Sequence, residues 1–316
     1  MDTILAVAER SGLVEEYHAG AVAVVDASGD VVAAAGDVDR SFFSRSAAKP
    51  FQAYAALGTG LELPAIHLAV ACASHSGDPV HVAIVEDILA RFGLDESDLR
   101  CPPDRPFERS DRRLAETGDV SPARRYHNCS GKHAAMLAAC AVAGWDISSY
   151  PDADHPLQQE VARVMADVVG DDVGPPGVDG CGLPVWRVTV RGLARAFSRL
   201  ENDPRFWTVR DVMSRYPMLV SGEGRADGLI GRWTGGIAKA GAAGCMGASV
   251  GGFGIAAKAW SGSGAVAGMG VGLGLGWLGV LSPAITRGLA GVTAPPVLGG
   301  GEPVGRFHAQ PVLESM

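Results

Sequence analysis

The sequence lacks the features that mark several large classes of protein. Charged residues make up only 20% of its 316 residues, and no dense face of lysine and arginine with interleaved aromatic residues offsets the formal net charge of −8. No nucleic-acid partner is therefore expected. The six cysteines are spread along the chain without a compact framework, which predicts thiols in a reducing compartment rather than a disulfide-stabilised fold.

The amino terminus also lacks a hydrophobic region of the signal-peptide type. Glu9 and Arg10 follow the short apolar start too soon to leave room for such a region. The expectation is a cytoplasmic protein.

One long stretch carries no formal charge, from Ala259 to Thr286, and it is long enough to cross a bilayer. Within it, Gly268, Gly272 and Gly276 have the four-residue spacing seen at contacts between membrane helices. However, Pro283 interrupts the stretch and no basic cluster flanks it. We therefore expect a buried helix whose glycines permit close packing, and no membrane partner.

The order of local patterns predicts the fold. Hydrophobic residues make up 47% of the chain, β-compatible runs lie at both ends, and helical periodicity fills the middle. This predicts an α/β (α+β) fold in which an antiparallel sheet built from N- and C-terminal segments packs against a central helical lobe. We expect a single domain over 1–316, with the sheet lobe at about 1–60 and 235–316 and the helical lobe at about 61–234. Local predictions are a hairpin over 19–36, helices over 51–61, 81–92, 157–169, 185–200 and 209–216, and strands over 237–240, 248–260 and 296–311.

The most informative short stretch is Ser46-Ala47-Ala48-Lys49, followed by Pro50. A hydroxyl three residues before an amine lies on the same side of a helical turn, where a neutral lysine can take the serine proton. Pro50 indicates that the helix begins close to residue 46, because proline is tolerated only in the first turn. The stretch therefore predicts either a nucleophile with its own base or an ordinary solvated helix start.

Three further clusters place polar groups beside apolar elements. Ser74 to Pro79 follows the apolar run Ile66 to Ala73, and Asn128 to His133 precedes an alanine-rich helix. Lys239 lies at the edge of a predicted strand. Small polar residues at the end of a packed element often mark a site, although a surface turn has the same appearance.

Six blocks together resemble the L-asparaginase II family, the type first known from rhizobial thermolabile asparaginase. They are Arg45–Pro50, Ala71–Gly77, Asn128–His133, Asp179–Gly182, Ser221–Arg225 and Ala238–Gly241. They occur in the order of the family, which makes them far more specific than any one block. The resemblance implies a fold similar to that of serine β-lactamases and penicillin-binding proteins.

The resemblance also implies roles for particular residues. Ser46 is expected to be the nucleophile and Lys49 its base, with Ser74 and Lys239 as a second Ser-Lys tandem beside the first. This agrees with electrostatics, because a desolvated lysine crowded by a second lysine has a lowered pKa and can act as a base.

In this family Cys129, Lys132 and Cys181 would hold a zinc ion, with water completing its shell. Two thiolates suit zinc, but lysine is an uncommon ligand and the usual Cys-x-x-Cys spacing is missing, so buried thiols are the alternative.

Three residues are candidates for binding the substrate. Arg45 and Asp179 would grip the charged groups of an amino acid, although Asp179 equally suits a capped turn. His75 is the third candidate, and a histidine that orients a neighbour is the commoner case.

The implied activity is hydrolysis of the side-chain amide of L-asparagine by a homodimer. A glutaminase, a penicillin-recognising hydrolase and a non-catalytic zinc-binding structural protein are the alternatives. The chain departs from the family at Ala242-Ala243-Gly244, where relatives usually carry a glutamate, and in the unusual glycine content of residues 261–281.

Overall fold

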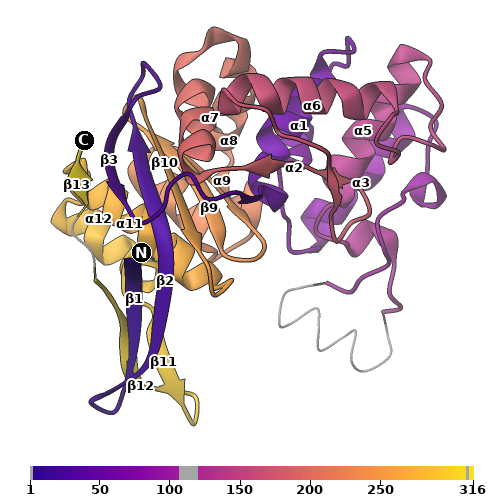
Figure 1. Cartoon of the computed structure of the whole chain (residues 1–316). Coiled ribbons are helices and arrows are strands. Elements are labelled where there is room, and N and C mark those ends of the chain that lie inside the picture. The colour runs from indigo at the N-terminus through magenta and orange to yellow at the C-terminus, as the bar shows by residue number, and fades with distance from the viewer. Residues whose placement is uncertain (1–2, 107–119, 311–312) are drawn as a thin grey trace.

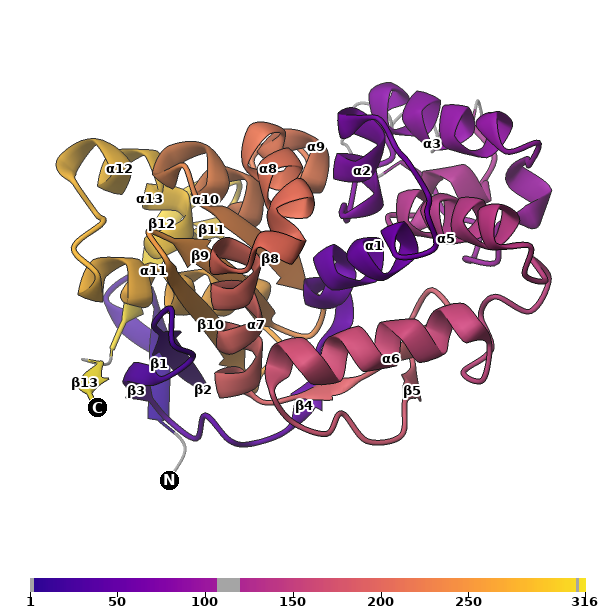
Figure 2. The same ribbon diagram turned by 90° about the horizontal axis from the view of Figure 1, so that it is seen from above.

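The computed structural model describes residues 3–106, 120–310 and 313–316. Its main feature is one large antiparallel sheet beside a group of helices (Figure 1). Over the described residues, nine strands make up this sheet, in the order β11-β12-β1-β2-β10-β9-β8, with β3 paired to β2 and β13 to β3. Many helices from the middle of the chain form a group to one side of the sheet, with α1 near the junction, and further helices lie against the sheet itself (Figure 2).

The strands come from the two ends of the chain, as the sequence predicts. The N-terminal strands are β1 (Thr3–Arg10), β2 (Leu13–Val25) and β3 (Val31–Ala35). The C-terminal strands are β8 (Ile237–Gly241), β9 (Cys245–Val250), β10 (Phe253–Ala259), β11 (Pro296–Gly299), β12 (Glu302–Ala309) and β13 (Glu314–Ser315). Pairing of β10 with β2 joins the two ends of the chain in the middle of the sheet. The predicted fold class is confirmed.

Helices occupy most of the described middle of the chain and cover both faces of the sheet. Those of the middle segment are α1 (Lys49–Leu57), α2 (Ala65–Ala71), α3 (Pro79–Arg91), α5 (Ser130–Ala143), α6 (Pro156–Val169), α7 (Val190–Asn202), α8 (Trp207–Arg215), α9 (Pro217–Ser221) and α10 (Ala226–Thr234). Those after β10 are α11 (Gly264–Trp277), α12 (Pro283–Gly288) and α13 (Ala290–Thr293). Short 3-10 helices are η1 (Arg45–Ala48), η2 (Glu96–Asp98), η3 (Arg124–Tyr126) and η4 (Pro204–Phe206).

Two helices pack on opposite faces of β10 through glycines. A Cβ on Gly254 would lie 2.0 Å from the carbonyl oxygen of Ala194 in α7. On the other face, a Cβ on Gly274 of α11 would lie 2.6 Å from the side chain of Ile255. Successive strand residues point to opposite faces, so the sheet is sandwiched between α7 and α11. The uncharged stretch thus contains α11, a largely buried helix of 14 residues, and no described helix has the length and apolarity needed to span a membrane.

One local prediction is wrong in its first part. The predicted helix over 185–200 begins only at Val190, where the Thr189 side chain caps it by accepting from the Gly192 amide at 2.9 Å. The preceding residues form β6 (Pro184–Val185) and β7 (Arg187–Val188), which pair with β5 (Gly177–Val178) and β4 (Phe42–Phe43). Tertiary pairing with distant strands decides the conformation here. The lobe boundaries near residues 60 and 235 stay a prediction, since α7 lies between them in sequence and packs on the sheet.

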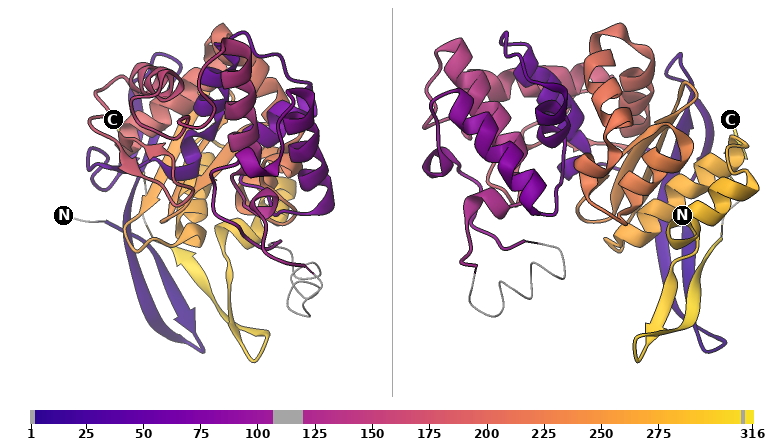
Figure 3. Two further views of the ribbon diagram at one scale, coloured as in Figure 1. Left: turned by 90° about the vertical axis from the view of Figure 1, so that its right-hand side faces the viewer. Right: turned by 180° about the vertical axis from the view of Figure 1, so that it is seen from behind.

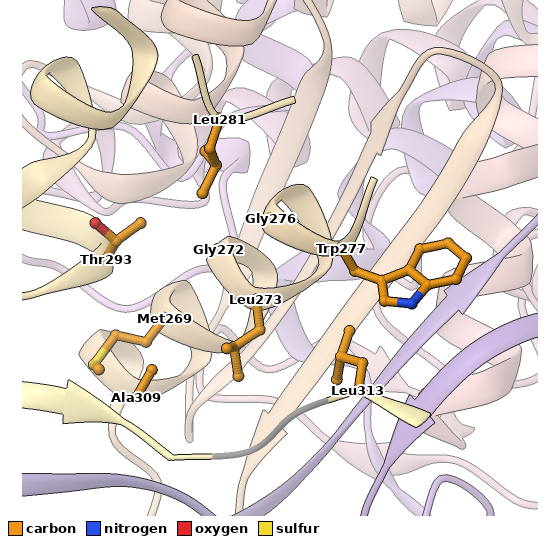
Figure 4. Close-up of a pocket in the computed structure, with 9 residues that line it drawn as sticks. All are labelled: Met269, Gly272, Leu273, Gly276, Trp277, Leu281, Thr293, Ala309 and Leu313. Carbon is orange, nitrogen blue, oxygen red and sulfur yellow. The ribbon is translucent and has the colours of Figure 1, made fainter. Parts of the chain in front are cut away.

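Two further features are a pair of projecting hairpins and a cavity. The far ends of the β1–β2 and β11–β12 hairpins extend together beyond the rest of the sheet (Figure 3). Beside α11 lies a cavity of about 370 Å³ with an apolar lining (Figure 4). Its lining residues are Met269, Gly272, Leu273, Gly276, Trp277, Leu281, Thr293, Ala309 and Leu313. None of these side chains titrates near neutral pH, so this cavity has no group for acid–base chemistry.

Candidate active site

The predicted nucleophile lies in a tight turn where strand β8 meets the start of a helix. Ser46 belongs to η1, and Lys49 and Pro50 open α1, as the sequence predicts. Arg45 has a φ of 48°, an uncommon value for a residue other than glycine. Gly241 of β8 abuts this turn, because a Cβ there would lie 3.2 Å from the Ala47 amide nitrogen. Such backbone strain is typical of functional sites.

The Lys49 amine is completely buried among two carbonyls, a hydroxyl and the Cys129 thiol. Its Nζ donates to the carbonyl oxygens of Ala73 and Asn128, at 2.5 and 3.1 Å, and lies 3.1 Å from Ser74 Oγ. Burial, the largest influence, lowers the pKa of Lys49 to about 8. A neutral amine has two N–H bonds and one lone pair, and carbonyls only accept. In its neutral form, the amine can give both N–H bonds to the two carbonyls and turn its lone pair toward the hydroxyl of Ser74.

The structure thus brings Lys49 and Ser74 together directly. Among the described hydrogen bonds, none joins Lys49 to Ser46, which is half-buried one helical turn earlier. Ser74 is 3% exposed, and its backbone is fixed by bonds from its own amide to Val220 O at 2.9 Å and from Arg225 Nη1 to its carbonyl at 3.0 Å.

Lys239 is equally buried but has a different partner. Its Nζ lies 3.2 Å from Oδ2 of Asp227 and donates to Ala240 O at 3.1 Å. Burial lowers the pKa of Lys239, although Asp227 opposes this change. Asp227 is 2% exposed. Burial raises its pKa, but Lys239 and Arg225 lower the pKa by more than burial raises it, so the carboxylate stays ionised. No described hydrogen bond joins Lys239 to Ser74, and their pairing as a tandem stays a prediction.

Arg45 and Asp179 form an ion pair that is partly open to solvent. The Nε–Oδ1 distance is 2.6 Å, and the side chains are 29% and 10% exposed. Asp179 Oδ1 also accepts from the Gly180 amide at 2.8 Å, so the turn and the ion pair share this carboxylate. The pair presents one positive and one negative group beside η1.

His75 uses both ring nitrogens within the protein. Nδ1 accepts from the Gly77 amide at 3.1 Å, so Nε2 carries the proton and donates to Ser130 Oγ at 2.9 Å. Burial lowers the pKa of His75 well below its usual value, which keeps the ring neutral. These contacts hold the loop after Ser74 against the start of α5, and a direct substrate contact by His75 stays a prediction.

Comparison with known proteins identifies the family. The sequence profile of L-asparaginase II matches residues 6–309, nearly the whole chain. The chain belongs to the L-asparaginase II family. Comparison with curated proteins gives no match.

Solved structures resemble the chain more distantly. A Bacillus glutaminase has 14% identity and a TM-score of 0.47, covering 83% of this chain and 91% of that one. Mglu in its native form has 18% identity and a TM-score of 0.42, covering 78% of this chain. Mglu in its glutamate form has 17% identity and a TM-score of 0.47, covering 83% of this chain. This L-asparaginase II chain spans 61% of the length of Mglu in either form.

The three residues expected to hold zinc in the L-asparaginase II family also come together. All three side chains are almost fully buried, and Lys132 Nζ lies 3.3 Å from Cys181 Sγ. A hydrogen bond from Cys181 is the largest influence that lowers the pKa of Cys129, while the same bond raises that of Cys181. The described residues contain no group of three or more His, Cys, Asp or Glu side chains suited to a metal, so the set depends on Lys132 as its third donor. Two adjacent thiols and an amine fit zinc by their donor chemistry.

The structure also reveals site residues that sequence reasoning missed. Asp227 and Asn128 O contact the two lysines, and Arg225, inside a recognised block, had no assigned role. An acidic residue two positions after Ser221–Arg225, within an apolar helix start, was the available signal for Asp227. No sequence signal identifies a backbone carbonyl such as that of Asn128.

Proposed function

We propose that this L-asparaginase II protein is an amidohydrolase that converts L-asparagine to aspartate and ammonia through an acyl-enzyme on Ser46. The observation that carries the proposal is the buried Lys49 amine, which two carbonyls and a serine hydroxyl surround. An amine with a pKa of about 8 is a competent base near neutral pH. Membership of the family supports an amide as the substrate.

The reaction begins at Ser46. Lys49 accepts the hydroxyl proton of Ser46 as its oxygen attacks the amide carbon, and the positive end of the helical segment favours the oxyanion. The hydrogen bond between Lys49 and Ser74 then gives the proton a route to the leaving nitrogen, which departs as ammonia. Water attacks the acyl-enzyme, Lys49 takes its proton, and the proton returns to Ser46 as aspartate leaves. Lys239 completes the polar surroundings of the relay.

The ion pair at the edge of the site supplies groups for the two charges of the substrate. The Arg45 guanidinium would bind the α-carboxylate, and the Asp179 carboxylate would bind the α-ammonium. Substrate binding would therefore exchange one internal ion pair for two with the ligand.

Cys129, Lys132 and Cys181 would hold the zinc ion. Bound zinc would keep Lys132 neutral and add positive charge beside the site. We expect about one zinc per purified chain by elemental analysis. Cys181→Ser should abolish zinc binding. Cys140→Ser, which changes a buried cysteine of α5 outside the proposed zinc site, should keep the zinc. Equal metal content in the two variants would remove this assignment.

An ammonia-release assay with purified protein tests the proposed reaction. Ser46→Ala should abolish ammonia release from asparagine, and the exposed neighbour control Ser41→Ala should keep it. Circular dichroism would show that both variants keep the fold. Full turnover by Ser46→Ala would exclude this nucleophile.

The alternatives give different assay patterns. A glutaminase would release ammonia faster from glutamine than from asparagine, and a penicillin-recognising hydrolase would open a β-lactam without amide turnover. A structural zinc protein would bind the metal and turn over neither. The expected homodimer and cytoplasmic location stay predictions, and light scattering on the purified protein checks the first.

A further inference from the structure

We propose that Asp227 is a positioning residue that holds Lys239 as an ammonium ion, so that Lys239 serves as a proton donor. The inference rests on the proposed amide hydrolysis and adds a role for the partner of its second buried lysine. It concerns a carboxylate outside every recognised sequence block.

The geometry supports a persistent ion pair. Asp227 Oδ2 lies 3.2 Å from Lys239 Nζ and accepts the amide of Ala240, the next residue along β8, at 3.0 Å. One carboxylate oxygen therefore holds both the amine of Lys239 and the backbone of β8 next to it. With 0% and 1% of the side chains exposed, water does not replace either contact.

The location of Asp227 in its helix favours the ionised carboxylate. Asp227 is the second residue of α10, and its Oδ1 accepts from the Gly228 amide at 3.3 Å. A carboxylate in the first turn of a helix is stabilised by the free amides and the positive end of the dipole. Asp227 thus remains a fixed negative charge against which an ammonium can be held.

The ammonium keeps one N–H bond for the reaction. An ammonium has three N–H bonds, and Asp227 and the Ala240 carbonyl accept two of them. Through the Ser74 carbonyl, Arg225 joins this pair to the loop that holds the other lysine. The remaining bond of Lys239 suits a leaving nitrogen or a developing negative charge.

The surroundings of the two lysines differ in their partners. Lys49 has two carbonyls, a hydroxyl and the Cys129 thiol, whereas Lys239 has a carboxylate fixed against its amine. The other titratable or charged groups that act on Lys239 are Arg225 before α10, Lys49 in α1, Cys72 after α2, Cys129 before α5 and Cys245 in β9.

Asp227→Asn tests the proposal, because it keeps the shape and removes the charge. We expect kcat for asparagine to fall on the order of 100-fold, with KM changed by less than about threefold. The alkaline limb of the kcat profile should move to lower pH, since Lys239 loses the charge that keeps it protonated. If neutral Lys239 were instead the base, the same variant would gain activity near neutral pH. Such a gain, or an unchanged limb, would overturn the proposal.

A double-variant cycle separates positioning from a merely structural role. Because Asp227 acts through Lys239, Asp227→Asn should change kcat by less than about twofold in a Lys239→Met background. A similar loss in both backgrounds would show that Asp227 only supports the fold. Asp227→Glu should restore the alkaline limb toward that of the original chain, and failure to do so would count against the retained charge as the cause. Asp167→Asn, which removes a half-exposed carboxylate paired with Arg199, serves as the matched control with unchanged kinetics.

Thermal unfolding distinguishes failure of this inference from failure of the proposed function. The unfolding midpoints of the original chain, the two single variants and the double variant give the coupling between positions 227 and 239. This coupling measures the ion pair without any substrate. If the original chain turned over no amide, the hydrolase proposal itself would fail. Normal turnover of asparagine with an unaltered Asp227→Asn profile would overturn only the positioning role.

Discussion

Two buried lysines, Lys49 in α1 and Lys258 in β10, differ in a way that bears on the proposed role of Lys49 as a base. Lys49 and Lys258 are both largely buried, and burial lowers the pKa of both. Each amine also donates to two backbone carbonyls. For Lys49 these belong to Ala73 and Asn128, and the third contact is the hydroxyl of Ser74.

Lys258 differs in that third contact. Its Nζ donates to the carbonyls of Ala243 and Ala259, and it lies 5.0 and 5.9 Å from the ring centroids of Trp260 and Phe42. Aromatic faces attract a cation and cannot give up a proton. In the proposed mechanism, burial alone therefore does not make a lysine the base, and an adjacent exchangeable proton is needed as well.

The largest expected effect comes from removing the Lys49 amine, with removal of the Lys258 amine as its comparison. Lys49→Met should lower kcat/KM for asparagine by about 10³-fold or more, because the proposed mechanism gives Ser46 no other base. Lys258→Met should leave kcat/KM within about twofold, because it contacts no reacting group. Steady-state ammonia release measures both. Equal losses in the two variants would contradict the distinction between the lysines.

Removing only the hydroxyl that distinguishes the two lysines should have a smaller effect. Ser74→Ala should lower kcat by about 10²-fold, since the proton route from Lys49 to the leaving nitrogen is lost. The nucleophile remains, so a single-turnover experiment should still show a slowly formed acyl-enzyme by mass spectrometry. An unchanged kcat would remove Ser74 from the relay.

The pH dependence of activity should follow Lys49. Its lowered pKa of about 8 means that the neutral base grows as pH rises toward that value. We expect kcat/KM to rise about tenfold per pH unit below pH 8 and then to level off before the alkaline limb that Lys239 sets. Lys258→Met should show the same limb. A shift of this limb in Lys258→Met would mean that Lys258, and not Lys49, sets the pH dependence.

The smallest effect concerns stability. Burial lowers the pKa of Lys258, so the folded state disfavours its ammonium relative to the unfolded chain, where the pKa is about 10.4. The unfolding free energy of the original chain should therefore increase as pH rises through the lowered folded pKa toward 10.4. Lys258→Met should show a smaller increase over that range in urea titrations. The same dependence of the unfolding free energy on pH in both proteins would mean that Lys258 does not cause the increase.

Local patterns predicted much of the fold because they depend on near neighbours. The hairpin over 19–36 and the helices α3 and α6 have the predicted positions, since their alternation and capping residues are contiguous in sequence. Residues 185–189 were predicted as helix, but Val185, Arg187 and Val188 lie in short strands, because pairing of Val188 with Phe42 lies beyond any local window. The tertiary pairing of two short strands outweighed the local helical propensity.

By itself the sequence determined that a serine and a lysine share one turn at the start of a helix, since three-residue spacing and Pro50 are local facts. It also determined, through the order of six blocks, the family of the chain. Only the tertiary structure decided which groups surround the lysines, because the partners are 25 residues apart for Lys49 and Ser74 and 134 for Arg45 and Asp179. Desolvation and ion pairing depend on what packing brings within a few ångströms, and those neighbours are not adjacent in sequence.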